Sequence, residues 1–246
     1  MFCSIGISPL YEVMASSQTL ISTPLAGAEA ARLNMVNGQI RPNRVNDPRL
    51  IEALRHLPRE QFLPSQLADQ AYVDRDIKLG AGRVMMAPMS VARLVQACAA
   101  RPGEHCLVVG AGTGYGTALL AATGAEIIAL ESDPALAEIG RAACASCAPG
   151  VQWQIGDLAA GSGGHGPFDV IMIEGAVSAL PRGLAAQLKP TGRMICVLIE
   201  GGIGRIVMAE ARAGGIAHVV LYDCMTAILP GFAAPSGFSF QANTRP

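Results

Sequence analysis

The sequence predicts an α/β fold in which a doubly wound, mostly parallel sheet follows an amino-terminal helical segment. Hydrophobic residues make up 51% of the 246-residue chain and charged residues only 15%, which is enough to bury a large core. Short apolar runs alternate with segments of helical spacing, the pattern of βαβ units. Aromatic residues make up only 4% of the chain, so aliphatic side chains must fill the core. Such a composition suits a parallel sheet covered by helices on both faces.

The first hundred residues divide into two parts. Residues 1–28 contain no Lys or Arg and lack the basic start of a secretory signal. Their content of Ser, Thr, Gly and Pro predicts a loose extension, or else an upstream start before Met14. Residues 29–100 are expected to form a helical segment with a loop on the substrate side. Asp47 before Pro48 predicts an N-cap and the first turn of a helix. The helices expected in this part lie at about 28–37, 48–57 and 89–99, and a flexible turn is expected at 80–82.

Residues 101–229 are expected to form the α/β core, and residues 230–246 a carboxyl-terminal coil. Apolar runs of strand length predict five strands, at 106–109, 127–130, 151–155, 169–173 and 194–199. Helices are expected at 115–122, from Pro134 onward and at 181–188. Two further runs, at 205–211 and 217–222, are separated by Gly214-Gly215 and predict a terminal antiparallel pair.

Composition also excludes several classes of protein. A formal net charge of -1 argues against a general nucleic-acid binder, which usually carries a basic excess. No apolar run approaches the ~20 residues of a spanning helix, so no membrane partner is expected. The seven cysteines are odd in number and irregularly spaced, and Cys144 and Cys147 form a lone CxxC, so we expect reduced thiols and a cytoplasmic protein. The oligomeric state stays open.

The strongest functional motif is Leu107–Gly116, which reads LVVGAGTGYG. An apolar strand runs into glycines that let the backbone turn tightly and approach a ligand closely. A dinucleotide fingerprint has its third glycine where this chain has Tyr115. Here Gly110, Gly112 and Gly114 follow a G-x-G-x-G spacing, which is typical of S-adenosylmethionine-dependent methyltransferases. A glycine-rich turn without a ligand is the alternative.

Acidic residues follow three of the predicted strands. Glu131 comes about 20 residues after the first loop glycine, where nucleotide-binding folds place an acid for the ribose hydroxyls. Gly156 and Asp157 follow the third strand, and Asp157 is a candidate acceptor for the adenine amino group or a turn-capping aspartate. Glu174 follows the fourth strand and is a candidate contact for the substrate or the cofactor ammonium. The four histidines are dispersed without metal-ligand spacing, so no metal is expected.

The region from about Arg32 to Leu198 resembles the protein-L-isoaspartate O-methyltransferase family. The segments that carry the likeness, besides the glycine loop, are RLNMVNGQI (32–40), DPRL (47–50), LPREQFLP (57–64), AY (71–72), PFDVI (167–171) and LAAQLKPTGR (184–193). The resemblance implies a Rossmann-like methyltransferase sheet. It implies S-adenosyl-L-methionine binding by Gly110, Gly112, Gly114, Glu131, Gly156 and Asp157. It also implies protein repair, by methyl esterification of isoaspartyl carboxylates in damaged peptides or proteins.

The chain departs from the family pattern beside the expected substrate. The family carries a threonine and then a serine where this chain has Val84 and Met86, and its usual acid before the glycine loop is replaced by Val108. A carboxylate is already ionised at neutral pH and needs no general base, so the sequence assigns no catalytic residue. Arg83 is a candidate for a bidentate contact that replaces the lost hydroxyls, or else a solvated arginine.

Three other functions compete with isoaspartyl methylation. The altered segment is compatible with a regulatory protein that binds the cofactor without catalysis. It is also compatible with an O-methyltransferase for a different acidic substrate. A nicotinamide dehydrogenase ranks last because Tyr115 replaces the third glycine.

Overall fold

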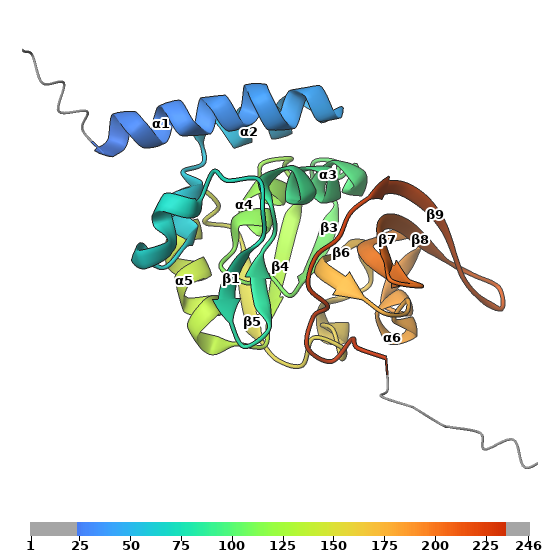
Figure 1. Cartoon of the computed structure of the whole chain (residues 1–246). Coiled ribbons are helices and arrows are strands. Elements are labelled where there is room, and N and C mark those ends of the chain that lie inside the picture. The colour runs from blue at the N-terminus through green and yellow to red at the C-terminus, as the bar shows by residue number, and fades with distance from the viewer. Residues whose placement is uncertain (1–23, 235–246) are drawn as a thin grey trace, which may run out of the picture.

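The computed structural model describes residues 24–234, and its centre is a seven-stranded sheet of order β5-β4-β3-β6-β7-β8-β9 (Figure 1). The strands are β3 (His105–Val109), β4 (Glu126–Glu131), β5 (Gln152–Ile155), β6 (Phe168–Val177), β7 (Leu188–Glu200), β8 (Ile203–Arg212) and β9 (Gly215–Asp223). Strands β3 to β7 pair in parallel, while β8 and β9 add an antiparallel edge. The predicted fold class is confirmed, and so is the terminal antiparallel pair.

The helices connect and cover these strands. They are α1 (Pro24–Met35), α2 (Pro48–His56), α3 (Pro88–Cys98), α4 (Tyr115–Ala121), α5 (Pro134–Cys144) and α6 (Arg182–Ala185). Asp47 and Asp133 cap α2 and α5 by accepting hydrogen bonds from backbone amides of the first turn, as the sequence predicts for Asp47. Helix α1 begins at Pro24, so the last five residues of the predicted loose extension are helical. Residues 1–23 of that extension lie outside the described residues.

Each face of the sheet packs against a different layer. Alternate residues of a strand point to opposite faces, so Cys106 and Val108 belong to one core, while Leu107 and Val109 belong to the other. The first core also takes in α3, α4 and the amino-terminal helical segment. On the second face α6 is only four residues long, shorter than the helix expected at 181–188. Two side chains from the segment after β9, Leu229 and Phe232, also pack on that face.

A small antiparallel hairpin of β1 (Ile77–Gly80) and β2 (Arg83–Met85) replaces the flexible turn expected at 80–82. Gly80, Ala81 and Gly82 all have positive φ, which closes the turn tightly. Because side chains alternate along a strand, Arg83 and Met85 are buried and Val84 between them is only partly buried. The hairpin therefore directs Arg83 into the body of the protein.

The packing of α5 against β5 depends on Gly140. A Cβ built at Gly140 would lie 2.2 Å from the ring of Trp153, the single tryptophan of the chain. We expect Gly140→Ala to lower the free energy of unfolding by about 1–3 kcal/mol, because the indole must move, although alanine favours a helix. Denaturant unfolding followed by Trp153 fluorescence measures this. Gly150→Ala, where nothing lies within 4 Å, is the control, and equal stability of the two variants would contradict the prediction.

Candidate functional site

The glycine loop lies at the carboxyl end of β3 and leads directly into α4. Gly110, Gly112 and Gly114 have φ values of 73°, 55° and 89°, a left-handed conformation that side chains disfavour. The amides of Gly110 and Ala111 donate to the carbonyl of Leu130 on β4, so the loop is tied to the neighbouring strand. The loop therefore makes the tight glycine turn that the motif predicts, at the carboxyl ends of the strands, where open α/β sheets bind ligands.

Gly114 has a packing role within this loop. A Cβ built there would lie 3.1 Å from both Cys144 Sγ and the Trp153 ring, and 3.2 Å from the Cα of Gly140. The missing side chain thus lets α5 and β5 approach the start of α4. At Gly112 the nearest atom to such a Cβ is Arg83 Nη2 at 3.7 Å. Gly112, unlike Gly114, faces the part of the site that Arg83 fills.

Glu131 is the last residue of β4, and its carboxylate is completely buried. Oε2 accepts a hydrogen bond of 2.6 Å from the amide of Gly112, while Oε1 accepts bonds of 2.8 and 3.0 Å from the amides of Ser132 and Asp133. These donors fix the orientation of the carboxylate. The acid and the loop that the sequence predicts as partners are therefore in direct contact.

Arg83 covers this carboxylate and is 3% exposed. Its Nη1 forms an ion pair with Glu131 Oε1, and its Nη2 donates a bond of 3.0 Å to the carbonyl of Gly110. This buried position contradicts the solvated alternative for Arg83. The predicted contact with a substrate carboxylate is untested, and the partner that the structure shows is Glu131.

Leu229 closes the loop from the other side, and no sequence motif points to it. A Cβ at Gly110 would lie 2.8 Å from Leu229 Cδ1, and one at Gly175 would lie 2.6 Å from its Cγ. The backbone of Leu229 is held by a 2.9 Å bond from its amide to the carbonyl of Ala176 on β6. Arg83 and Leu229 cover the loop at Gly110, and every residue from Gly110 to Gly116 is buried.

Gly156 and Asp157 lie beside Glu131, at the end of β5. The amide of Gly156 donates a 3.0 Å bond to the carbonyl of Glu131. Asp157 is exposed, and its Oδ1 accepts a 2.9 Å bond from the amide of Ala159, the turn-capping arrangement. Its role toward adenine remains a prediction.

Glu174 lies within β6, which runs on to Val177, and its carboxyl is buried against the start of α4. A Cβ at Gly116 would lie 2.4 Å from Glu174 Oε2, so only glycine leaves room for this carboxyl. Burial raises the pKa of Glu174 to about 8, and the neighbouring cations of Arg83 and Arg59 limit the rise. Glu174 is therefore mostly protonated at neutral pH, which a strand-end acid facing solvent would not be.

Arg59 is the second buried cation here, and sequence reasoning assigns it no role. Its Nε donates to the carbonyl of Ala71 at 2.7 Å and its Nη2 to that of Met86 at 2.5 Å, and the guanidinium lies 4.6 Å from the centre of the Tyr115 ring. Arg59 thus positions the main chain at Met86, where the family pattern has a hydroxyl. Buried polar atoms without a partner among the described residues also gather around the loop: Arg59 Nη1, Arg83 Nε, Tyr115 Oη, Thr117 Oγ1 and Glu174 Oε2.

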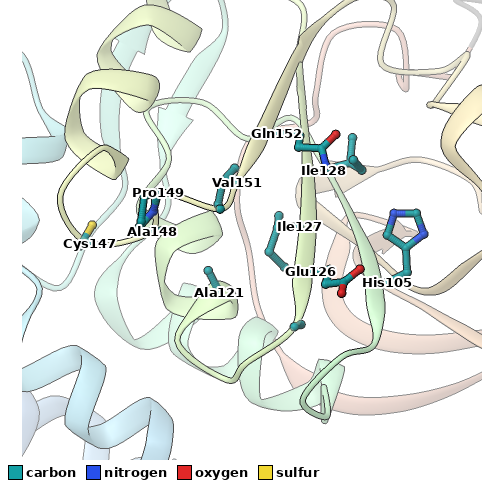
Figure 2. Close-up of a pocket in the computed structure, with 12 residues that line it drawn as sticks. His105, Ala121, Glu126, Ile127, Ile128, Cys147, Ala148, Pro149, Val151 and Gln152 are labelled. Carbon is teal, nitrogen blue, oxygen red and sulfur yellow. The ribbon is translucent and has the colours of Figure 1, made fainter.

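A hollow of about 560 Å³ lies at the amino ends of β3, β4 and β5, at the opposite end of these strands from the glycine loop (Figure 2). His105, Glu126 and Gln152, which begin β3, β4 and β5, line it together with aliphatic residues. It includes none of the predicted site residues. Within residues 24–234 there is no cluster of three or more His, Cys, Asp or Glu side chains arranged to hold a metal, and no helix long and apolar enough to cross a membrane.

These features fit a nucleoside-containing cofactor at the loop. Glu131 has the acceptor atoms that ribose hydroxyls require, and the glycine loop lets backbone approach a ligand. The nearest atoms to a Cβ at Gly110 and at Gly112 belong to the flexible ends of the Leu229 and Arg83 side chains. A ligand there must therefore displace side chains and need not rebuild the fold.

Comparisons with known proteins support this interpretation. Residues 31–224 match the family model described as protein-L-isoaspartate(D-aspartate) O-methyltransferase. A protein-L-isoaspartate O-methyltransferase of Methylorubrum extorquens is 40% identical over 193 residues, covering 78% of this chain and 84% of that protein. One of Koribacter versatilis is 30% identical over 204 residues, covering 82% and 92%.

Among solved structures, a beta-aspartate methyltransferase of Plasmodium falciparum in complex with S-adenosyl-L-homocysteine has the same fold. The TM-score is 0.67 at 19% identity, covering 82% of this chain and 97% of that one. The match spans the helical segment, the glycine loop, Glu131 and the parallel strands, so this chain belongs to the protein-L-isoaspartate (D-aspartate) O-methyltransferase family.

Proposed function

We propose that this protein is an S-adenosyl-L-methionine-dependent O-methyltransferase that esterifies the carboxylate of isoaspartyl residues in damaged proteins. The observation that carries the proposal is the family match over residues 31–224, which includes the glycine loop in contact with the Glu131 carboxylate. A regulatory protein without catalysis is not favoured, because relatives covering most of the chain carry the enzyme's name.

The residues proposed to hold the cofactor are those around the loop. Glu131 accepts hydrogen bonds from the ribose, while Gly110, Gly112 and Gly114 shape the backbone and Gly156 and Asp157 border the adenine side. When bound, the cofactor supplies an electrophilic methyl group on a sulfonium, whose sulfur keeps the electron pair of the broken bond. The attacking oxygen belongs to an ionised carboxylate, so no side chain has to remove a proton.

The contribution of the protein is therefore positioning and exclusion of water. The loop and its acid lie in a buried environment, and two buried arginines, Arg83 and Arg59, lie close by. A displacement reaction of this kind gains most from holding the reacting atoms in line and away from solvent. Neither Val84 nor Met86 carries a donor for the acceptor carboxylate, so a guanidinium is the available group.

Transfer of a labelled methyl group tests the proposal. The purified protein is incubated with methyl-labelled cofactor and a peptide containing one isoaspartyl residue. We expect label to enter the peptide and to be released by mild base, as a methyl ester is. The same peptide with ordinary aspartate is the control. Absence of base-labile label on the isoaspartyl peptide would reject the activity.

We also place the protein in the cytoplasm, where its substrates would be isoaspartyl-containing proteins. The six cysteines within the described residues are free, and four of them are buried as small apolar side chains. Reduced thiols of this kind are usual in a reducing compartment.

A further inference from the structure

The carboxylate proposed to bind ribose is already bound by a side chain of this protein. Arg83 pairs with Oε1 of Glu131 and reaches the carbonyl of Gly110 with its second terminal nitrogen. The amides of Ser132 and Asp133 also donate to Oε1, and the amide of Gly112 donates to Oε2. Because the carboxylate is completely buried and Arg83 covers it, a ribose that reaches Glu131 must take the place of Arg83.

The segment after β9 adds a second cover, which we call the strap and define as residues 226–232. In Figure 1 the chain passes back from β9 to run beside β6. Backbone bonds from Ala176 to Ala227, from Leu229 to Ala176 and from Ser178 to Phe232 attach it to β6. The hydroxyl of Thr226 donates to Asp76, whose other oxygen accepts from the amide of Ala87 just after β2. The strap and the hairpin that carries Arg83 are thus linked through one aspartate.

We propose that Arg83 is an internal competitor for the cofactor at Glu131 and is drawn away by the carboxylate of the methyl acceptor, so that cofactor and acceptor bind cooperatively. The inference rests on the proposed function and adds a specificity-determining residue to it. When Arg83 has left Glu131, the open state, it supplies the donors that Val84 and Met86 lack. When Arg83 is paired with Glu131, the closed state that the structure shows, it balances the charge of the carboxylate and keeps water from the loop.

Electrostatics gives the reason for cooperativity. A guanidinium displaced from Glu131 loses its counter-charge, and a buried cation without a partner is unfavourable. The other acid near Arg83 is Glu174, which is mostly protonated at neutral pH. The anion that restores balance is the acceptor carboxylate, which guanidinium binds with two parallel hydrogen bonds. Because binding linkage is reciprocal, an acceptor that holds Arg83 raises cofactor affinity by the same factor that the cofactor raises acceptor affinity.

A binding experiment without turnover tests this. The full-length protein is titrated with S-adenosyl-L-homocysteine, which has no methyl group to transfer, in the absence and presence of a saturating isoaspartyl peptide. Calorimetry and Trp153 fluorescence report binding, since this indole packs against Gly114. We expect the peptide to tighten binding to the wild-type protein about tenfold. Arg83→Met is expected to bind about tenfold more tightly without peptide and to lose the peptide effect.

Two further variants separate the contributions. Leu229→Ala opens the strap side but keeps the ion pair, so it is expected to bind more tightly and still respond to peptide. Arg193→Met removes an ion pair with Glu104 and bonds to the carbonyls of Cys98 and Ala99, all away from the glycine loop. Its cofactor binding and its response to peptide are expected to match those of the wild type. The variants are compared only when their circular dichroism matches that of the wild type.

The outcomes distinguish the inference from the proposed function. Binding to wild type that the isoaspartyl peptide leaves unchanged overturns the inference, even if Arg83→Met does not fold. Arg83→Met that binds no more tightly, or keeps the full peptide effect, overturns it as well. If neither wild type nor any variant binds with or without peptide, the cofactor assignment itself fails and the inference fails with it.

Discussion

Glu131→Gln is expected to lower the free energy of unfolding by about 3–5 kcal/mol, because it leaves the buried guanidinium of Arg83 without a counter-charge. The amide nitrogen of glutamine would also face backbone donors that now point at a carboxylate oxygen, either that of Gly112 or those of Ser132 and Asp133. Denaturant unfolding at neutral pH measures the loss. The same variant is expected to bind S-adenosyl-L-homocysteine at least a hundredfold more weakly, since two charge-assisted bonds are worth about 3–6 kcal/mol.

The double variant Arg83→Met/Glu131→Gln is the matched control. Removing both charges is expected to restore most of the lost stability, because a neutral pair of similar volume suffers no unpaired buried charge. Cofactor binding should stay weak, because the ribose acceptor is still missing. A single variant as stable as wild type would show that the pair is not buried as the structure has it. Recovery of binding in the double variant would remove Glu131 from the site.

The second large effect concerns pH. Burial raises the pKa of Glu174 from its ordinary value of 4.5 to about 8, and the nearby Glu131 adds to the rise, while Arg83, Arg59 and the amide of Gly116 oppose it. Between these two values the unfolded chain ionises this carboxyl and the folded protein keeps it protonated. The stability that Glu174 contributes is therefore complete below about pH 4.5 and is lost as the pH rises through about 8.

Glu174→Gln removes this titration, because the amide stays neutral at every pH. We expect the stability of the variant relative to wild type to rise by roughly 3 kcal/mol between pH 5.5 and 8.5, at about 1.4 kcal/mol per pKa unit. Denaturant unfolding at both pH values measures the difference in free energy of unfolding between variant and wild type. Other titrating groups contribute equally to both proteins and cancel in this difference. Glu138→Gln on the exposed side of α5 is the control and should track wild type. Parallel stability curves for Glu174→Gln and wild type would contradict the prediction.

Much of the fold follows from local sequence pattern. Apolar runs such as Cys106–Val109 are long enough for one strand and are bounded by turn residues. The strands and their succession along the chain were therefore predictable. Asp47 predicts the start of α2, because a side-chain cap is an interaction between residues close in sequence. The extent of β6 was not predictable in the same way. Its continuation to Val177 depends on pairing with β7 and with the strap, which are distant in sequence.

The site shows the same division. The loop and Glu131 were predicted together, and the structure joins them through the amide of Gly112. The partner of Arg83 was not predicted. The β1–β2 hairpin decides which way the Arg83 side chain faces, whereas the sequence predicted only a flexible turn at 80–82. Arg59 lies in the family-like segment 57–64, yet its role was not predictable, because its bonds are to the backbone carbonyls of Ala71 and Met86, which are distant in sequence.

The amino-acid sequence alone determined the class of fold, the glycine-rich turn and the acid beside it. The first two arise from residues adjacent in the chain or repeated at the spacing of a strand, and the acid follows the first loop glycine at the distance typical of nucleotide-binding folds. Only the tertiary structure decided that this turn is closed, because Arg83 and Leu229 approach it from segments 27 residues before and 119 residues after Gly110. Burial there converts an ordinary arginine into the counter-ion of Glu131 and keeps a proton on Glu174, effects that depend on the exclusion of water from the assembled core.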